Sequence, residues 1–282
     1  IKYLLMGVTM LKKPYIKPDI QDYIRSKLND IEQAHQIKII HAIESGSRAW
    51  GFPSIDSDYD VRFIYVRQIK DYLSVRNYTD HIETPIVFDD FFGVPFDLNG
   101  WDLRKALKLS IKSNPVLVEW LVSPICYIND QSSADLLNFT KEVANLDSFL
   151  YHYDRLARSS WNQILQDPNN VKTKLYCYAL RPVIAMRWII QKHTTPPMDM
   201  LTLCNGCIND NILYAEIVSL IERKSNVKEG DLIPRNIILD SFIESSLEHE
   251  SKRIMPEANT DTCIIDKADK IFFKISQYNN LK

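Results

Sequence analysis

Two short segments near the start of the chain constrain its fold most strongly. Residues 45–51 contain a Gly-Ser turn, and residues 57–62 place Asp58 and Asp60 at the opening of an apolar run that ends at Val66. Side chains two residues apart in a strand point to the same face, so these aspartates are expected to project side by side. Two carboxylates at that spacing repel each other unless a positive group lies between them. Because carboxylate oxygens are the ligands that Mg²⁺ prefers, the segment predicts a divalent metal site at the start of a strand.

The Gly-Ser turn adds a second chemical signal. Gly46 and Ser47 follow a strand predicted over residues 37–43 and precede a short helix-like stretch. Backbone N–H groups at such a turn, together with the positive end of a helix, form a cradle for phosphate. A phosphate cradle beside a two-carboxylate metal site indicates phosphoryl or nucleotidyl transfer.

The two segments resemble the signature of the polymerase-β-like nucleotidyltransferase superfamily, in which a Gly-Gly or Gly-Ser pair precedes Asp-x-Asp. Within that superfamily the sequence is similar to the YcgL-type branch, also described as RNA-ligase-associated nucleotidyltransferases. The resemblance spans residues 37–200, and the stretches that carry it are residues 46–52, 57–62, 100–107 and 113–121, with a weaker one at 178–188. It implies a small nucleotidyltransferase sheet followed by a helical bundle that closes one side of the active site.

Two-metal transfer generally uses a third carboxylate, either as a metal ligand or to accept the proton of the attacking hydroxyl. Asp97 is the preferred candidate, because it lies in an apolar run downstream of the Asp-x-Asp pair, as the third acid of the superfamily does. Two alternatives stay open. Asp102 is better suited to cap the following helix, and the Asp89-Asp90 pair is expected at the tip of a hairpin.

The residues around the Gly-Ser turn are candidates either to bind the substrate or to stabilise the fold. By the resemblance, Gly46 and Ser47 hold the β- and γ-phosphates of a nucleoside triphosphate, through close backbone approach and a hydroxyl respectively. Arg48 either pairs with a phosphate or forms a salt bridge on the outer face of the helix. Ser57 either hydrogen-bonds the metal-site carboxylates or caps its own turn. Trp50 is expected to pack in the core rather than to stack on a base.

Further cations are candidates for substrate contacts. Lys105 is either a solvated surface cation or a contact to the triphosphate or the RNA backbone. Lys174, Tyr178 and Arg181 share one face of a predicted helix, because they are spaced four and three residues apart. That face is expected to meet the triphosphate or base, or else to form an inter-domain salt-bridge surface.

Composition narrows the class of protein. The formal net charge of −2 gives no overall basic signal for nucleic acid, although a local basic surface remains compatible with it. Five cysteines argue against a disulfide framework and for a reducing compartment, and Cys204 and Cys207 are expected to be ordinary reduced thiols around a Gly turn. With no stretch apolar enough to span a bilayer, we expect a cytoplasmic protein that does not enter the membrane.

The pattern of elements predicts an α+β fold: a small mixed-sheet polymerase-β-like nucleotidyltransferase domain followed by an all-α helical domain. Residues 1–18 are expected to be a leader or extension, with Met10 a plausible start, residues 19–130 the α/β domain and residues 131–282 the helical domain. Strands are expected over residues 37–43, 58–66, 84–88, 94–98 and 125–128. Helices are expected over residues 19–34, 71–75, 101–111, 115–122, 134–157, 160–166, 171–192, 210–224 and 233–249.

The sequence therefore predicts an enzyme that transfers a nucleoside monophosphate from an NTP to a hydroxyl and releases pyrophosphate. It would use two Mg²⁺ ions, with Mn²⁺ as a possible substitute. Asp58, Asp60 and Asp97 would act at the metals. The resemblance implies an RNA 3′ end as acceptor, in RNA or tRNA repair beside an RNA ligase. The alternatives are transfer to a small molecule of the aminoglycoside type, transfer to protein hydroxyls, and a non-catalytic NTP-binding subunit.

Overall fold

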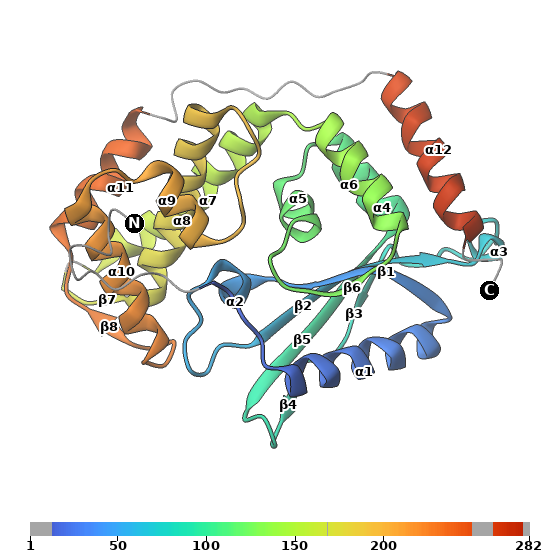
Figure 1. Ribbon diagram of the computed structural model, residues 1–282, viewed down its shortest axis with the longest axis horizontal. Helices are drawn as coiled ribbons and strands as arrows, with labels where there is room; N and C mark the ends of the chain where they lie inside the picture. Colours follow the sequence, from blue (N-terminus) through green and yellow to red (C-terminus); the bar gives the residue numbers. More distant parts are fainter. Residues whose placement is uncertain (1–12, 168, 250–261, 279–282) are drawn as a thin grey trace. The chain divides into compact units, whose positions relative to one another are not determined.

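The computed structural model describes residues 13–167, 169–249 and 262–278 (Figure 1). The chain divides into two compact units. The sheet unit comprises Tyr15–Gly46, Asp58–Ala144 and the described part of Glu257–Lys282, and the helical unit comprises Ser47–Ser57 and the described part of Asn145–Pro256, with the residues just before Tyr15. Most of the predicted leader, including Met10, lies outside the described residues.

The sheet unit contains one mixed sheet. Within the described residues its strand order is β3-β5-β2-β1-β6, with β4 pairing on β5. Strands β2 and β5 run parallel, whereas every other pair in this sheet is antiparallel. The strands are β1 Ile37–Glu44, β2 Tyr59–Arg67, β3 His81–Glu83, β4 Val87–Asp89, β5 Val94–Asp102 and β6 Cys126–Asn129. The predicted α+β class with a mixed sheet is confirmed.

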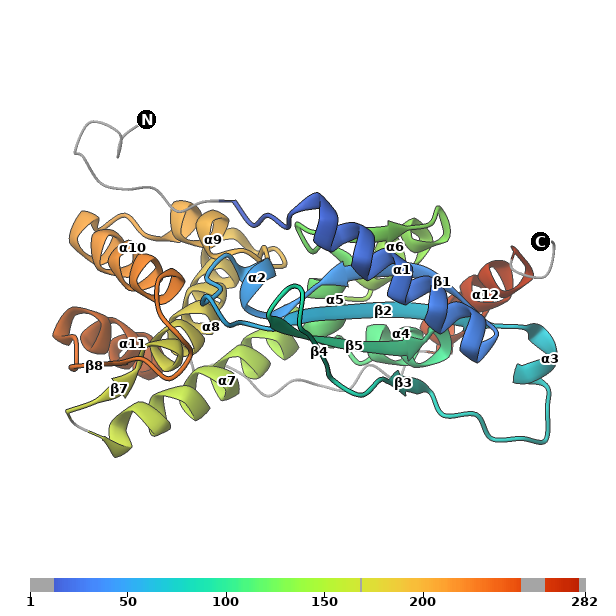
Figure 2. The ribbon, with the colours of Figure 1, turned by 90° about the horizontal axis from the view of Figure 1, so that it is seen from below.

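Helices cover both faces of this sheet (Figures 1 and 2). One face packs on α1 (Pro18–His35), whose buried residues recur at helical spacing. The other packs on α4 (Leu103–Ile111), α5 (Pro115–Leu121), α6 (Ser132–Glu142) and α12 (Thr262–Tyr278). The alternation of side chains along β2 sends Val61 and Phe63 to the α1 face and Ile64 to the other. Lys17 occupies the N-cap of α1, and Pro18 lies in its first turn.

The division into units differs from the boundary predicted at residue 130. Helix α6 belongs to the sheet unit, because Leu136 and Phe139 are buried in the core beneath α4 and α5. The last helix, α12, was not predicted, and its Ala268 and Ile275 are buried in the same core. Residues 47–57, by contrast, belong to the helical unit.

The helical unit is built mainly of helices joined by a short two-stranded ribbon. Instead of the predicted helices over 134–157 and 160–166, the chain breaks after α6, where the Asn145 side chain caps α7, and α7 then runs on without interruption. Helix α9 was not predicted: Cys204 and Cys207 are both buried within it and do not flank a turn. The elements are α7 Leu146–Gln166, β7 Val171–Lys172, α8 Thr173–Lys192, α9 Met200–Cys207, α10 Asn211–Ser225, β8 Leu232–Ile233 and α11 Ile237–His249. None of the described helices combines the length and apolar character needed to cross a membrane.

Stability at acid pH is expected to depend on His41, which lies in β1 of the sheet unit. Its ring is buried, and its Nε2 lies 3.1 Å from the Trp120 carbonyl oxygen, a contact that the neutral Nε2–H tautomer can make. Burial lowers the pKa of His41 below its ordinary value of 6.5. The unfolded chain therefore binds more protons than the folded one below about pH 6.5, and the free energy of unfolding falls as the pH drops through that window, by at most about 1.4 kcal/mol per pH unit. Urea unfolding of the wild type and His41→Gln between pH 7.5 and 5.5 measures this, and equal pH slopes would contradict it.

Candidate active site

The predicted carboxylates lie on two neighbouring parallel strands, or just before one of them. Asp60 in β2 is paired in register with Asp97 in β5, so their side chains are adjacent on the sheet. Asp58 comes just before β2, and both it and Asp60 are partly exposed while Tyr59 and Val61 are buried. The strand period thus places Asp60 on the face opposite α1, while a common face for Asp58 and Asp60 stays a prediction because Asp58 precedes the strand.

An arginine joins the two paired carboxylates. The Arg62 Nη2 donates to Asp60 Oδ1 at 3.0 Å and to Asp97 Oδ2 at 2.8 Å. Its Nη1 donates to the backbone carbonyls of Val61 at 3.0 Å and Asp97 at 2.9 Å, which anchors the guanidinium on both strands. Asn99, the register partner of Arg62, donates its Nδ2 to Asp97 Oδ1 at 2.6 Å. We call Asp60, Arg62, Asp97 and Asn99 the polar square.

Sequence reasoning missed Arg62 and Asn99. Their spacing could have revealed them, because Arg62 follows Asp60 and Asn99 follows Asp97 by two residues, and side chains at that spacing in a strand share one face. The positive group required between close carboxylates is thus supplied, for Asp60 and Asp97, by the protein itself.

A buried glutamate fixes the backbone at Asp60. Glu44 is fully buried at the end of β1, where its Oε1 accepts from Asp60 N at 3.0 Å and its Oε2 accepts from the Tyr127 hydroxyl at 2.6 Å. The Ser45 N–H also donates to the Asp60 carbonyl at 2.8 Å. Glu44 is a further residue that sequence reasoning missed, and its role is to position Asp60.

Gly46 approaches the Asp60 carboxylate so closely that no side chain fits between them. Its φ is +58°, and a Cβ built at this position would lie 2.0 Å from Asp60 Oδ2. Glycine is therefore required here for both its left-handed backbone and the contact. The close contact observed at Gly46 is with the Asp60 carboxylate, while the predicted approach to a phosphate stays a prediction.

The donor set fits a hard divalent cation. Asp60 and Asp97 present carboxylate oxygens side by side, Asp58 comes just before β2, and the absence of a side chain at Gly46 leaves the backbone against Asp60 Oδ2. Among the described residues no group of three or more His, Cys, Asp or Glu side chains has the arrangement of a complete metal site. Asp102 and Asp89 were alternatives to Asp97 as the third carboxylate, and both have structural roles. Asp102 caps α4 by accepting from Arg104 N, and Asp89 stabilises the β4–β5 turn by accepting from Phe91 N and Phe92 N.

The serines of the turn form a buried hydroxyl chain in the helical unit. Ser47, in the short helix α2 (Gly46–Trp50), donates from its Oγ to Ser57 Oγ at 3.2 Å, and Ser54 Oγ lies 2.7 Å from Ser57 Oγ. Ser57 Oγ also accepts from Ser54 N at 2.9 Å, so Ser57 caps its own turn rather than bonding the carboxylates. Arg48 donates to the Ser57 carbonyl at 2.6 Å, a contact that neither predicted alternative included.

A buried lysine lies at the other end of this hydroxyl chain. Lys224 in α10 is 1% exposed, and its Nζ lies 3.4 Å from Ser54 Oγ. Burial lowers the pKa of Lys224, because the ammonium loses its hydration. Neither Ser54 nor Lys224 was singled out from the sequence.

The predicted face of α8 is packed within the helical unit. Lys174 pairs with Glu229 at 2.9 Å, so its salt bridge lies inside one unit rather than between domains. Arg181 is buried, donates its Nε to the Met198 carbonyl at 3.0 Å and lies over the Trp50 ring. The Tyr178 ring meets the Trp50 ring edge-on with centroids 5.6 Å apart, and the core-packing role predicted for Trp50 is consistent with these contacts.

Lys105 is not beside the carboxylates. It lies in the first turn of α4, past the end of β5, where its Nζ pairs with Asp80 at 3.1 Å. The strand from Asp97 to Asp102 spans about 17 Å at the usual rise per residue. A triphosphate contact near Asp97 is therefore not supported for Lys105, whereas an RNA-backbone contact stays a prediction.

Removing the arginine of the polar square is expected to destabilise the metal-free protein and to make added Mg²⁺ more stabilising. Arg62→Met leaves Asp60 and Asp97 adjacent without their shared donor, at a cost of about 1–3 kcal/mol. A divalent cation can replace the lost charge. Urea unfolding with EDTA and with Mg²⁺ measures both effects. Arg25→Met is the matched control, since Arg25 also bonds a carbonyl and a carboxylate, those of Tyr127 and Asp22. An equal Mg²⁺ response in both variants would contradict the prediction.

The chain is similar to two curated proteins and, weakly, to one solved structure. The chain is 44% identical over 236 residues to the uncharacterized protein YcgL of Bacillus subtilis (strain 168), covering 83% of this chain and 86% of the relative. It is 26% identical over 180 residues to the uncharacterized protein 062L of Invertebrate iridescent virus 6, covering 63% of this chain and 89% of that protein. A nucleotidyltransferase-like protein from Exiguobacterium sibiricum 255-15, solved at 1.90 Å, aligns at 10% identity with a TM-score of 0.30, over 89% of this chain and 79% of the other, a likeness too low to bear on fold or function.

The family model named RlaP matches residues 20–274, which include the polar square, Gly46 and most of the helical unit. The chain therefore belongs to the RNA repair pathway DNA polymerase beta family.

Proposed function

We propose that the protein is a metal-dependent nucleotidyltransferase that moves a nucleoside monophosphate from an NTP to an RNA 3′ hydroxyl and releases pyrophosphate. The observation that carries the proposal is the register pairing of Asp60 with Asp97 beside a glycine that no other residue could replace. Membership of a polymerase β family linked to RNA repair agrees with it.

The chain's own residues would act mainly by positioning and by charge. Asp58, Asp60 and Asp97 would hold two Mg²⁺ ions, or Mn²⁺ in their place, and these ions supply Lewis-acid charge that polarises the phosphates and the acceptor hydroxyl. Asp97 would also take the proton as the hydroxyl oxygen bonds to the α-phosphorus and the bond to the pyrophosphate oxygen breaks. Gly46 and Ser47 would orient the leaving phosphates. Arg62, anchored on both strands, keeps Asp60 and Asp97 in place.

We also propose that residues of the helical unit contact the substrate. Lys174 and Tyr178 would contact the triphosphate or base, with Arg48 as a further phosphate contact, whereas Arg181 is buried and bonds the Met198 carbonyl. An RNA ligase that seals the extended end would be the natural partner of such an activity.

The direct test incubates the purified protein with Mg²⁺ and each labelled NTP in turn, with a tRNA, a cleaved RNA and an aminoglycoside as acceptors. We expect label on an RNA 3′ end, lost with EDTA and with Asp60→Asn. Label on the aminoglycoside or on protein would retain the chemistry and overturn the acceptor. Binding of NTP by calorimetry without transfer to any acceptor would favour a non-catalytic subunit.

A further inference from the structure

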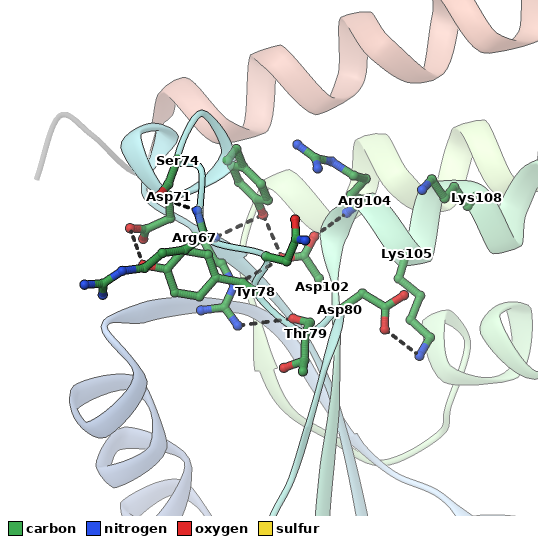
Figure 3. A pocket seen from close by; sticks show the side chains of 13 residues that line it. Arg67, Asp71, Ser74, Tyr78, Thr79, Asp80, Asp102, Arg104, Lys105 and Lys108 are labelled. Carbon is green, nitrogen blue, oxygen red and sulfur yellow. Dashed lines mark hydrogen bonds and ion pairs between the residues drawn. The ribbon is translucent and has the colours of Figure 1, made fainter.

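A second polar pocket lies at the opposite end of the parallel strand pair from Asp60 (Figure 3). It is formed where β2 ends at Arg67 and β5 ends at Asp102, and by the segment that follows β2 through α3 (Ile69–Tyr72). Seven residues of β2 separate Asp60 from Arg67, which is about 23 Å at the usual rise. The pocket is therefore distinct from the polar square.

The arginine of this pocket is buried with few of its hydrogen-bonding groups used. Arg67 is 7% exposed, and its Nε has no hydrogen-bond partner. Its Nη2 makes only long contacts of 3.4 Å, to the Tyr65 hydroxyl and the Thr79 carbonyl. A guanidinium offers five donors, and leaving them unused in a buried place is costly. Arg67 therefore has unused N–H donors that could bind an anion.

Its neighbours orient this guanidinium, and Asp102 forms one long ion pair with it. The Asp102 Oδ2 lies 3.8 Å from Arg67 Nε, and the same carboxylate accepts from the Tyr72 hydroxyl at 3.0 Å and from Arg104 N at 2.8 Å. The guanidinium carbon lies 4.7 Å from the centroid of the Tyr78 ring, a geometry that fixes its plane.

The rim of the pocket carries more positive than negative charge, although the chain as a whole is slightly acidic. Arg76 and Lys108 make no ion pair with any residue that the structure describes, while Lys105 pairs with Asp80. Figure 3 shows Arg104 and Lys105 in one turn of α4 and Lys108 in the next, beside the pocket. The charged lining residues are Arg67, Arg76, Arg104, Lys105 and Lys108 against Asp71, Asp80 and Asp102. A concave site with this balance attracts anions by focusing its field.

We propose that this pocket binds a phosphate group, with Arg67 as its buried anchor and Arg76 and Lys108 as its outer cations. A phosphate suits the site better than a single carboxylate does, because its oxygens can bond a planar arginine fork and cations from other directions together. The phosphate belongs either to RNA, at a 5′ end or in the backbone, or to a free anion. Only the RNA source rests on the proposed function.

The test measures binding without NTP and with EDTA, so that the metal site contributes nothing. The probes are inorganic phosphate, by calorimetry, and one labelled RNA oligonucleotide with either a 5′-phosphate or a 5′-hydroxyl. Arg67→Gln is expected to weaken binding about ten- to a hundred-fold, as the loss of hydrogen bonds to a charged group implies. The double variant Arg76→Gln/Lys108→Gln reports on the rim if Arg67→Gln impairs folding, which circular dichroism would reveal. The double variant Lys112→Gln/Lys141→Gln removes two exposed lysines of the sheet unit outside the pocket and is the matched control.

The outcomes separate the sources. Weaker binding of only the 5′-phosphorylated RNA in the pocket variants assigns a 5′ end, weaker binding of both RNAs assigns the backbone, and weaker binding of inorganic phosphate alone assigns a free anion. The proposal is overturned if both pocket variants bind every probe as strongly as the control variant does. A protein that binds phosphate here yet transfers no nucleotide would contradict the proposed function alone, and transfer activity without any effect of the pocket variants would contradict this inference alone.

Discussion

Replacing Asp60 by asparagine is expected to lower the rate of nucleotidyl transfer by about a thousand-fold or more. The amide keeps the size of the side chain and can still accept from Arg62, but it removes the charge that holds a divalent cation. Charge neutralisation by a metal contributes several kcal/mol to such a reaction, and about 4 kcal/mol corresponds to a thousand-fold. The measurement is kcat for transfer of a labelled nucleotide under saturating NTP and Mg²⁺.

The matched control is Asp90→Asn, which removes an exposed carboxylate of the same unit at the β4–β5 turn. Asp97→Asn is expected to behave like Asp60→Asn, because the two carboxylates are register partners. Full activity of Asp60→Asn would refute the metal assignment. Loss of activity in Asp60→Asn but not in Asp97→Asn would rule out Asp97 as the third acid.

Gly46→Ala is expected to reduce transfer by about a hundred-fold or more. The new methyl would meet Asp60 Oδ2 at 2.0 Å, so the carboxylate must turn away from its present position. A displacement of about 1 Å in a catalytic group can cost a hundred-fold in rate. Part of the effect would be lost stability, because an alanine at φ +58° is also strained by about 1 kcal/mol.

Gly93→Ala separates these two effects. Gly93 has a similar φ of +68°, but a Cβ there would meet nothing within 4 Å. Both variants should therefore lose a comparable amount of unfolding free energy from backbone strain, while only Gly46→Ala loses activity beyond what its folded fraction explains. Urea unfolding and transfer assays on the same preparations make the comparison. Equal activity in the two variants would show that the contact with Asp60 has no catalytic consequence.

Much of the local structure follows from short-range rules. The two-residue period of a strand predicts a common face for Asp58 and Asp60, and the spacing of Ile20, Ile24 and Leu28 makes α1 amphipathic. The helices α4, α8, α10 and α11 were likewise predicted within a few residues. By contrast, the break between α6 and α7 was missed, because the apolar pattern continues across it and only the capping by Asn145 marks the new helix.

The amino-acid sequence by itself determined the two-residue spacing of Asp58 and Asp60, and the family resemblance singled out Gly46 and Asp97 as candidates. Only the tertiary structure decided that Asp97 lies opposite Asp60, that Arg62 joins them, and that Arg67 is buried at the far end of the same strand. The physical reason is that the register of β2 on β5 is set by packing and hydrogen bonds between segments far apart in the chain. The packing of α6 and α12 against the sheet also depends on contacts between distant segments. Their buried side chains complete a core that the local sequence pattern does not predict.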